Sequence, residues 1–128
     1  MELKMIERLI DSVIIIDHLN GIKNATQFML ELDPQKTAIS VITRAEILTG
    51  IDRDEQATVI QLLDHYNLFI IDKPIADLAA DLRRDHGWKL PDSFQAALAK
   101  HHKTQLTTRN SKDFDPAKFD FVEIPYNL

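Results

Sequence analysis

The chain has 128 residues, of which 45% are hydrophobic, and it contains no cysteine. This length and composition predict one folded domain over residues 1–128 and exclude disulfides and cysteine-ligated zinc. The formal net charge is −5, from 20 acidic and 15 basic residues, which is unusual for a nucleic-acid binder. A role on nucleic acid would therefore require several acids to be gathered around cations.

Membrane and export signals are missing from the sequence. No apolar stretch approaches the ~20 residues of a membrane span, and the early run at 13–16 is bracketed by Asp11 and Asp17. The N-terminus has neither the basic start nor the apolar middle of a signal peptide. We therefore expect a cytoplasmic protein without membrane contact.

The first half of the chain predicts a strand, two helices, a second strand and two further helices. Breaks at Asn20-Gly21, Asp33-Pro34 and Gly50 separate them. The expected strands cover 5–10 and 37–40, and the expected helices cover 12–19, 23–32 and 40–47, with a fourth helix beginning at Asp54.

The second half predicts a strand at 68–71, a helix from Pro74 to Gly87, a helix from Pro91, and strands at 105–108 and 121–124. No internal repeat or linker interrupts the pattern. Strands separated by helices indicate an α/β fold, a three-layer α/β/α sandwich around a mostly parallel sheet. In such a sheet, functional sites lie outside the carboxyl ends of the strands.

Four acids belong to segments that emerge at, or lead away from, that edge: Asp11, Glu46, Asp92 and Asp113. Carboxylates brought together repel one another, and a hard divalent cation relieves the repulsion. Magnesium prefers oxygen ligands and keeps several waters, and it can activate water against a phosphodiester. The pattern therefore favours metal-assisted hydrolysis without a side-chain nucleophile.

Each acid also has a plain structural interpretation. Asp11 and Asp92 stand where helices begin, a position that favours an acidic side chain. Glu46 can be a surface residue on a partly apolar helix face, and Asp113 can simply belong to a polar loop. Only the ordered set of four, each in the expected element, supports the metal interpretation.

Four segments resemble the successive motifs of PIN domains, specifically those of VapC-type toxins. Leu-Ile-Asp-Ser (9–12), with Asp-His-Leu (17–19) beyond it, resembles the first motif. Ile-Ser-Val-Ile-Thr-Arg-Ala-Glu-Ile-Leu-Thr-Gly (39–50) is similar to the second. Leu-Pro-Asp-Ser-Phe-Gln-Ala-Ala (90–97) resembles the third, and Thr-Thr-Arg-Asn-Ser-Lys-Asp-Phe (107–114) resembles the fourth. The motifs stand in family order and span nearly the whole chain.

The resemblance implies a ribonuclease that depends on Mg²⁺ or Mn²⁺ and acts as the toxin of a toxin–antitoxin pair. By position, Asp11 and Asp92 would be the principal metal ligands, and Glu46 and Asp113 would complete the acidic pocket directly or through water. Polar residues of the same motifs would hold the water shell of the metal or a phosphate: Ser12, Thr108 and Asn110.

The resemblance also implies partners. It predicts a homodimer held by the early helices, and a small antitoxin whose C-terminal segment lies across the active-site groove. DNA would be met only through the antitoxin. Among the basic residues that could meet RNA phosphates, Arg109 has the best setting; the others are Arg44, Arg53 and Lys89.

Two alternatives remain at the level of sequence. The family often has a polar residue two positions after the first acid, where this chain has Val13. A catalytically weak or inactive PIN module that acts by partner binding would fit this departure, and titration with Mn²⁺ would distinguish it. A phosphotransfer domain also uses an acid at a strand end, but the dehalogenase type needs a second Asp at position 13, and the paired acids of a receiver are missing.

Overall fold

The structure is a computed structural model, and it describes residues 5–128. Five short strands are β1 (Arg8–Ile10), β2 (Thr37–Ser40), β3 (Asn67–Phe69), β4 (Gln105–Thr107) and β5 (Val122–Glu123). The helices are α1 (Ser12–Leu19), α2 (Lys23–Leu30), α3 (Val41–Thr49), α4 (Gln56–Leu63), α5 (Lys73–His86) and α6 (Leu90–His102). Two 3₁₀ helices, η1 (Pro34–Lys36) and η2 (Arg53–Glu55), precede β2 and α4.

The strands form one parallel sheet in the order β3-β2-β1-β4-β5. β1 is central: Leu9 pairs with Ala38 of β2 on one side and with Leu106 of β4 on the other. From β1 the chain first builds outward through β2 and β3, and then returns to add β4 and β5 on the opposite side. The direction of strand addition therefore reverses between β1 and β4, which is where parallel α/β sheets bind ligands.

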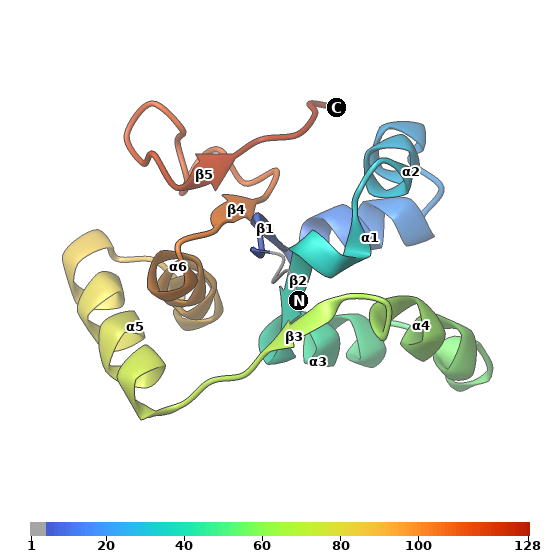
Figure 1. The fold of residues 1–128 in the computed structure, drawn as a ribbon, viewed down its shortest axis with the longest axis horizontal. Coiled ribbons are helices and arrows are strands. Elements are labelled where there is room, and N and C mark those ends of the chain that lie inside the picture. The colour runs from blue at the N-terminus through green and yellow to red at the C-terminus, as the bar shows by residue number, and fades with distance from the viewer. Residues whose placement is uncertain (1–4) are drawn as a thin grey trace.

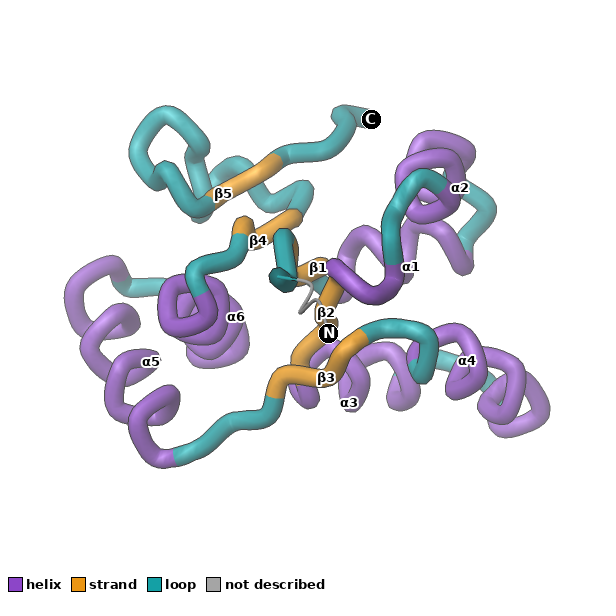
Figure 2. Tube along the Cα trace, viewed as in Figure 1, coloured by secondary structure: helices purple, strands orange, loops and turns teal. Residues whose placement is uncertain are grey.

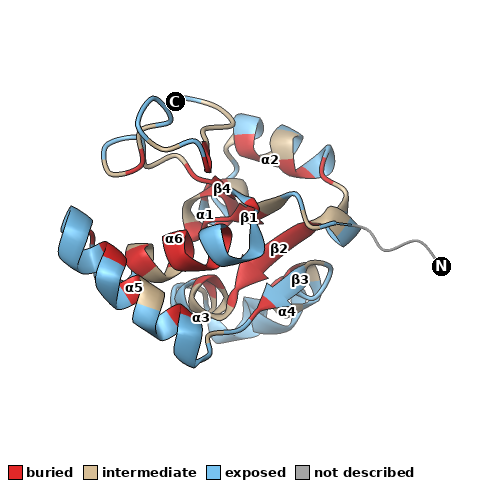
Figure 3. Ribbon diagram, turned by 60° about the vertical axis from the view of Figure 1, so that its left-hand side comes forward, coloured by how far each residue is buried: buried red, intermediate tan, exposed pale blue. Residues whose placement is uncertain are grey.

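Helices cover both faces of the sheet, with α5 and α6 on one side and α1 to α4 on the other (Figure 1). Successive residues of β1 pack against different helix layers, because successive strand side chains point to opposite faces of the sheet. Leu9 packs in a core with α5 and α6, whereas Ile10 packs in a second core with α1 to α4. β1 and β2 are buried, and α6 is largely buried between the sheet and α5 (Figure 3).

Capping side chains place polar groups where the strands end. Asp11 follows β1 and caps α1 by accepting a hydrogen bond from the Ser12 amide. Ser40 ends β2 and caps α3 in the same manner, with its hydroxyl accepting from the Thr43 amide at 3.0 Å. A left-handed Gly87, with φ of 72°, ends α5 before the chain turns into α6.

The predicted α/β/α fold class is confirmed, with differences at the ends of elements. The strand expected at 68–71 is observed as Asn67–Phe69, because β2 has already turned into α3 beyond the Ser40–Phe69 pair, so Ile70 and Ile71 have no β2 residue to pair with. The helix expected from Asp54 begins as η2 and becomes α-helical only at Gln56.

The strand expected at 37–40 is confirmed as β2, whereas the strand expected at 105–108 ends at Thr107 and two others were also too long. The first strand, expected at 5–10, begins at Arg8, and the last, expected at 121–124, is limited to Val122–Glu123. Much of the segment between β4 and β5 is loop or turn (Figure 2). Among residues 5–128, no helix is long and apolar enough to cross a membrane.

Candidate active site

The carboxyl ends of β1, β2 and β4 meet at one edge of the sheet. Asp11 is the first residue after β1, and its amide donates to the Thr107 carbonyl of β4 at 2.9 Å. Thr108 follows β4 directly, so Asp11 and Thr108 face each other across the point where strand addition reverses. The strand ends therefore position polar side chains at the switch point where parallel α/β sheets bind ligands.

The carboxylate of Asp11 is held on both oxygens. Its Oδ1 accepts from the Ser12 amide at 2.9 Å and from Nε2 of Gln95 at 3.1 Å. Its Oδ2 accepts from the Thr108 hydroxyl at 2.8 Å. Asp11 is only 8% exposed, so these three donors fix the rotamer of a nearly buried carboxylate.

Asp92 lies in the first turn of α6, close enough to the other three acids for their charges to affect its pKa. Burial, followed by repulsion from neighbouring carboxylates, raises the pKa of Asp92 from 3.8 to about 6. In decreasing order these carboxylates belong to Asp11, Asp113 and Glu46, while Lys89 acts in the opposite direction. The four predicted acids therefore share one electrostatic neighbourhood, although they come from four separate segments.

Glu46 approaches the same place from α3. Burial raises the pKa of Glu46, and the carboxylate of Asp11 raises it further, while a hydrogen bond from the Ser12 side chain partly offsets both effects. The residue is exposed. Glu46 is therefore close enough to Asp11 for the two carboxylates to repel each other, and it still reaches the surface.

The loop after β4 carries the fourth acid. The Asn110 side chain donates to Oδ2 of Asp113 at 3.0 Å, and the Asn110 amide donates to the Thr108 hydroxyl at 3.1 Å. The indole of Trp88, which is 6% exposed, donates to the Asp113 carbonyl at 3.2 Å. Thr108, Asn110 and Asp113 thus form a hydrogen-bonded loop that is tied both to Asp11 and to the core.

The acids fit a cation that is only partly coordinated by protein. Among residues 5–128, no group of three or more His, Cys, Asp or Glu side chains is placed to hold a metal ion by itself. Magnesium does not require such a cage, since it is commonly bound through one or two carboxylates and keeps several waters. The raised pKa of Asp92 shows an excess of negative charge that a hard cation would relieve.

A protein-family model for the PIN domain matches residues 8–119 of the chain. The chain belongs to the PIN-domain family. The matched segment includes Asp11, Glu46, Asp92 and Asp113, and it runs from β1 into the loop before β5. No curated protein sequence matches the chain.

Solved structures place this PIN domain among toxin–antitoxin proteins. A chain of a toxin–antitoxin complex from Klebsiella pneumoniae is 35% identical, with a TM-score of 0.87 over 95% of this chain and 100% of that chain. FitAcB from Neisseria gonorrhoeae is 22% identical, with a TM-score of 0.77 over 94% and 99%. VapBC2 from Rickettsia felis, bound to a DNA fragment from its promoter, is 20% identical, with a TM-score of 0.73 over 91% and 96%. The predicted membership in the VapC-type PIN group is confirmed.

Arg109 is engaged inside the PIN domain. Its guanidinium donates to both carboxylate oxygens of Asp17, at 2.8 and 3.1 Å. The Tyr126 hydroxyl donates to the same carboxylate at 2.9 Å. Burial disfavours the ionised form of Asp17, but the hydrogen bonds from Arg109 and Tyr126 hold its pKa below 3.8. A phosphate contact by Arg109 stays a prediction, and it would compete with this ion pair.

Gln95 and Asp17 stand in segments that resemble PIN motifs, but the sequence predicted no role for either. Gln95 stands three residues after Asp92 on α6 and is only 1% exposed; a polar residue inside the apolar run 94–99 was the available signal. Asp17 lies on α1 and is 6% exposed. Its partners are 92 and 109 residues away in sequence, so no local pattern could have paired them.

Proposed function

We propose that this PIN domain is an endoribonuclease that depends on Mg²⁺ or Mn²⁺ and acts as the toxin of a toxin–antitoxin pair. The observation that carries the proposal is the convergence of Asp11, Glu46 and Asp113 on Asp92 from separate segments, close enough that their charges add to the effect of burial in raising the pKa of Asp92. Such a concentration of negative charge is costly in an apo protein and is expected where a cation binds. Residues 1–128 would act as one domain.

Each acid has a distinct role in the proposed reaction. Asp11 and Asp92 would hold the metal, and Glu46 and Asp113 would hold metal-bound waters or complete the ligand set. When bound, the metal would supply an activated water and stabilise the charge that develops on the phosphodiester. The Thr108 hydroxyl and the Gln95 amide keep the Asp11 carboxylate in one orientation. Ser12 and Asn110 lie beside Asp11 and Asp113 and are available to orient water or a phosphate oxygen.

An apolar groove beside the acids supports the proposed antitoxin. It has a volume of about 200 Å³ and is lined by Ile16, Leu19 and Ile51, with Glu46 at its side. A peptide with apolar side chains and a basic residue would complement both the groove and the carboxylates. DNA would be contacted through the antitoxin only.

The early helices support a homodimer. Leu30, on α2, is 81% exposed, so a second copy could cover apolar surface there. Light scattering of the purified chain tests this part of the proposal. A monomer at all accessible concentrations would remove the dimer from the proposal without affecting the nuclease.

Asp11→Asn tests the nuclease. The purified wild-type chain should cleave single-stranded RNA with Mg²⁺ or Mn²⁺ and lose the activity in EDTA. Asp11→Asn removes a metal-ligand charge while keeping the shape of the side chain, and we expect loss of at least about 100-fold in cleavage rate. Asp77→Asn, an exposed acid of α5, is the matched control and should cut as the wild type does.

Two results would contradict the nuclease. Cleavage by Asp11→Asn at the wild-type rate would assign the activity to a contaminant. Failure of the folded wild type to bind Mn²⁺ in calorimetry would instead favour a partner-binding PIN module. The departure at Val13 has a packing explanation, since this half-buried side chain packs against the core on the α1 to α4 side of the sheet.

A further inference from the structure

One buried amide joins three of the elements that carry the acids. Nε2 of Gln95 donates to Oδ1 of Asp11 at 3.1 Å and to Oγ1 of Thr43 at 2.8 Å. Gln95 belongs to α6, Asp11 follows β1, and Thr43 belongs to α3. Both hydrogens of a single NH₂ group are therefore used to tie together segments that are 52 and 84 residues from Gln95 in sequence.

Each of the three segments joined by this amide carries one of the acids, at or near the residue that takes part in the hydrogen bonds. Asp92 lies three residues before Gln95 on α6, so the two side chains share a helix face. Glu46 lies three residues after Thr43 on α3, with the same consequence. Thr43 is itself fixed, because the Ser40 hydroxyl lies 3.3 Å from its hydroxyl and 3.0 Å from its amide. The bridge therefore links the three segments that carry Asp11, Asp92 and Glu46.

The orientation of the amide leaves its oxygen without a partner. An ionised carboxylate only accepts hydrogen bonds, so Asp11 requires the NH₂ side of Gln95 to face it. Oε1 is then buried with no hydrogen-bond partner within the described part of the chain. A buried unpaired acceptor destabilises the fold, and an apolar side chain of similar length would avoid it. The glutamine therefore combines two hydrogen bonds to fixed acceptors with one unsatisfied oxygen.

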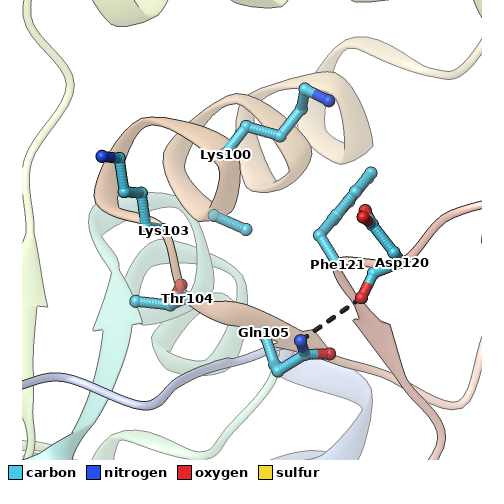
Figure 4. A pocket seen from close by; sticks show the side chains of 7 residues that line it. Lys100, Lys103, Thr104, Gln105, Asp120 and Phe121 are labelled. Atoms are coloured by element: carbon cyan, nitrogen blue, oxygen red, sulfur yellow. Dashed lines mark hydrogen bonds between the residues drawn. The ribbon is translucent and has the colours of Figure 1, made fainter.

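A second unpaired buried oxygen provides a comparison far from the acids. Oγ1 of Thr104 also has no partner among residues 5–128, and Thr104 is 4% exposed. It lines a pocket of about 400 Å³ between the C-terminal end of α6 and the start of β4, together with Lys100 and Lys103 (Figure 4). α6 begins at the acidic edge and ends here, so this pocket lies at the opposite edge of the sheet.

We propose that Gln95 is a positioning residue that holds Asp11 at the separation from Asp92 and Glu46 that a divalent cation requires. The proposal rests on the proposed metal-dependent function. Gln95 acts through Asp11 and Thr43 and contacts neither the metal nor RNA. Its unpaired oxygen is the structural cost of presenting two N–H groups to fixed acceptors.

Gln95→Met separates positioning from packing. Methionine has a similar length and removes both the two N–H donors and the unpaired oxygen. We expect Mn²⁺ affinity, measured by titration calorimetry and by the paramagnetic resonance signal of free Mn²⁺, to fall about 10- to 100-fold. The melting temperature in EDTA should fall only modestly, because removal of the unpaired oxygen partly offsets the loss of the two hydrogen bonds. Unchanged Mn²⁺ affinity in a folded variant would overturn the proposal.

Thr43→Val and a double variant measure whether the bridge acts as a unit. Valine keeps the shape of threonine and removes the hydroxyl that accepts from Gln95. We expect a smaller loss of Mn²⁺ affinity, and little further loss when Thr43→Val is added to Gln95→Met, because residues in one network are not additive. Fully additive losses would overturn the bridge. If Gln95→Met does not fold, Thr43→Val alone decides: a several-fold loss of affinity supports the bridge, and wild-type affinity refutes it.

Thr104→Val is the matched control for a buried hydroxyl without a partner. It should raise the melting temperature in EDTA and leave Mn²⁺ affinity unchanged, since Thr104 lies at the edge of the sheet away from the acids. An equal loss of affinity in Thr104→Val would assign the effect of Gln95→Met to general packing. Absence of Mn²⁺ binding in the wild type would reject the proposed function together with this inference, whereas wild-type binding with an unaffected Gln95→Met rejects the inference alone.

Discussion

Asp92→Asn should stabilise the protein without metal and destabilise it relative to the wild type with metal. The folded-state pKa of Asp92 is about 6, against 3.8 in a free side chain. A group with a raised pKa contributes stability that is complete below the unfolded value and is lost as pH rises through the folded value. The ionised Asp92 therefore opposes folding at neutral pH, and asparagine removes that opposition.

The size of the effect follows from the shift. Two pKa units correspond to about 3 kcal/mol, since one unit is worth about 1.4 kcal/mol. Solvent reaches this side chain, which is intermediate in exposure, and screening reduces the value to about 1–2 kcal/mol. Asparagine also loses the favourable charge in the first turn of α6, worth about 0.3–1 kcal/mol. The net expectation at pH 7.5 in EDTA is a gain of about 1 kcal/mol in the free energy of unfolding.

Urea denaturation of both proteins at pH 7.5 and pH 4 is the measurement. In EDTA the advantage of Asp92→Asn should be present at pH 7.5, shrink as pH falls from about 6 to 4, and then vanish. Free Mg²⁺ at about ten times its dissociation constant should add about 1.4 kcal/mol to the wild type, which reverses the order of stability. Asp77→Asn should have the same stability as the wild type both in EDTA and with Mg²⁺.

Two outcomes would refute the electrostatic reasoning. One is a variant that is less stable than the wild type at pH 7.5 in EDTA. The other is an advantage of equal size at pH 4, because a protonated Asp92 already lacks the charge that asparagine removes. Either result would mean that the neighbouring carboxylates do not act on Asp92 as the structure indicates.

Two further predictions concern stability away from the acids. Tyr126→Phe should lower the free energy of unfolding at pH 7 by about 1.5–3 kcal/mol, because a hydrogen bond to the charged Asp17 is lost. Since the pKa of Asp17 is lowered, this difference between variant and wild type should shrink as pH falls below about 4. A difference in urea titrations that does not depend on pH would contradict this explanation. Lys103 ends α6 in a left-handed conformation with φ of 55°. Lys103→Gly should therefore raise the free energy of unfolding by about 0.5–1 kcal/mol, and a lower melting temperature would show that the lysine side chain contributes more than the backbone strain costs.

Local signals in the sequence were sufficient for the parallel α/β fold and for the edge where the acids meet. Capping residues such as Asp11 and Ser40 and the stop at Gly87 act within a few residues, so they can be read without tertiary structure. Strand lengths were less predictable, because β3 ends where its neighbour β2 turns into α3 rather than where its own apolar residues end.

Contacts between distant segments could not be predicted. Gln95 was inconspicuous because a glutamine in an apolar helix face has several explanations until the position of Asp11 is known. The same holds for Asp17, whose partners stand in the loop after β4 and near the C-terminus. These interactions are specified by the fold as a whole, and a single sequence contains no pattern that pairs them.

The contact of Tyr126 with Asp17 makes the last residues part of the scaffold of the acidic site. Tyr126 also lies against Phe28 of α2, with ring centroids 6.4 Å apart, and Asn24 donates to the Asn127 carbonyl. Through Asp17, the same cluster holds Arg109, which immediately follows Thr108. Shortening the chain after Glu123 or fusing a bulky tag to Leu128 would thus disturb the acidic site from outside it, so an affinity tag is better placed at the N-terminus.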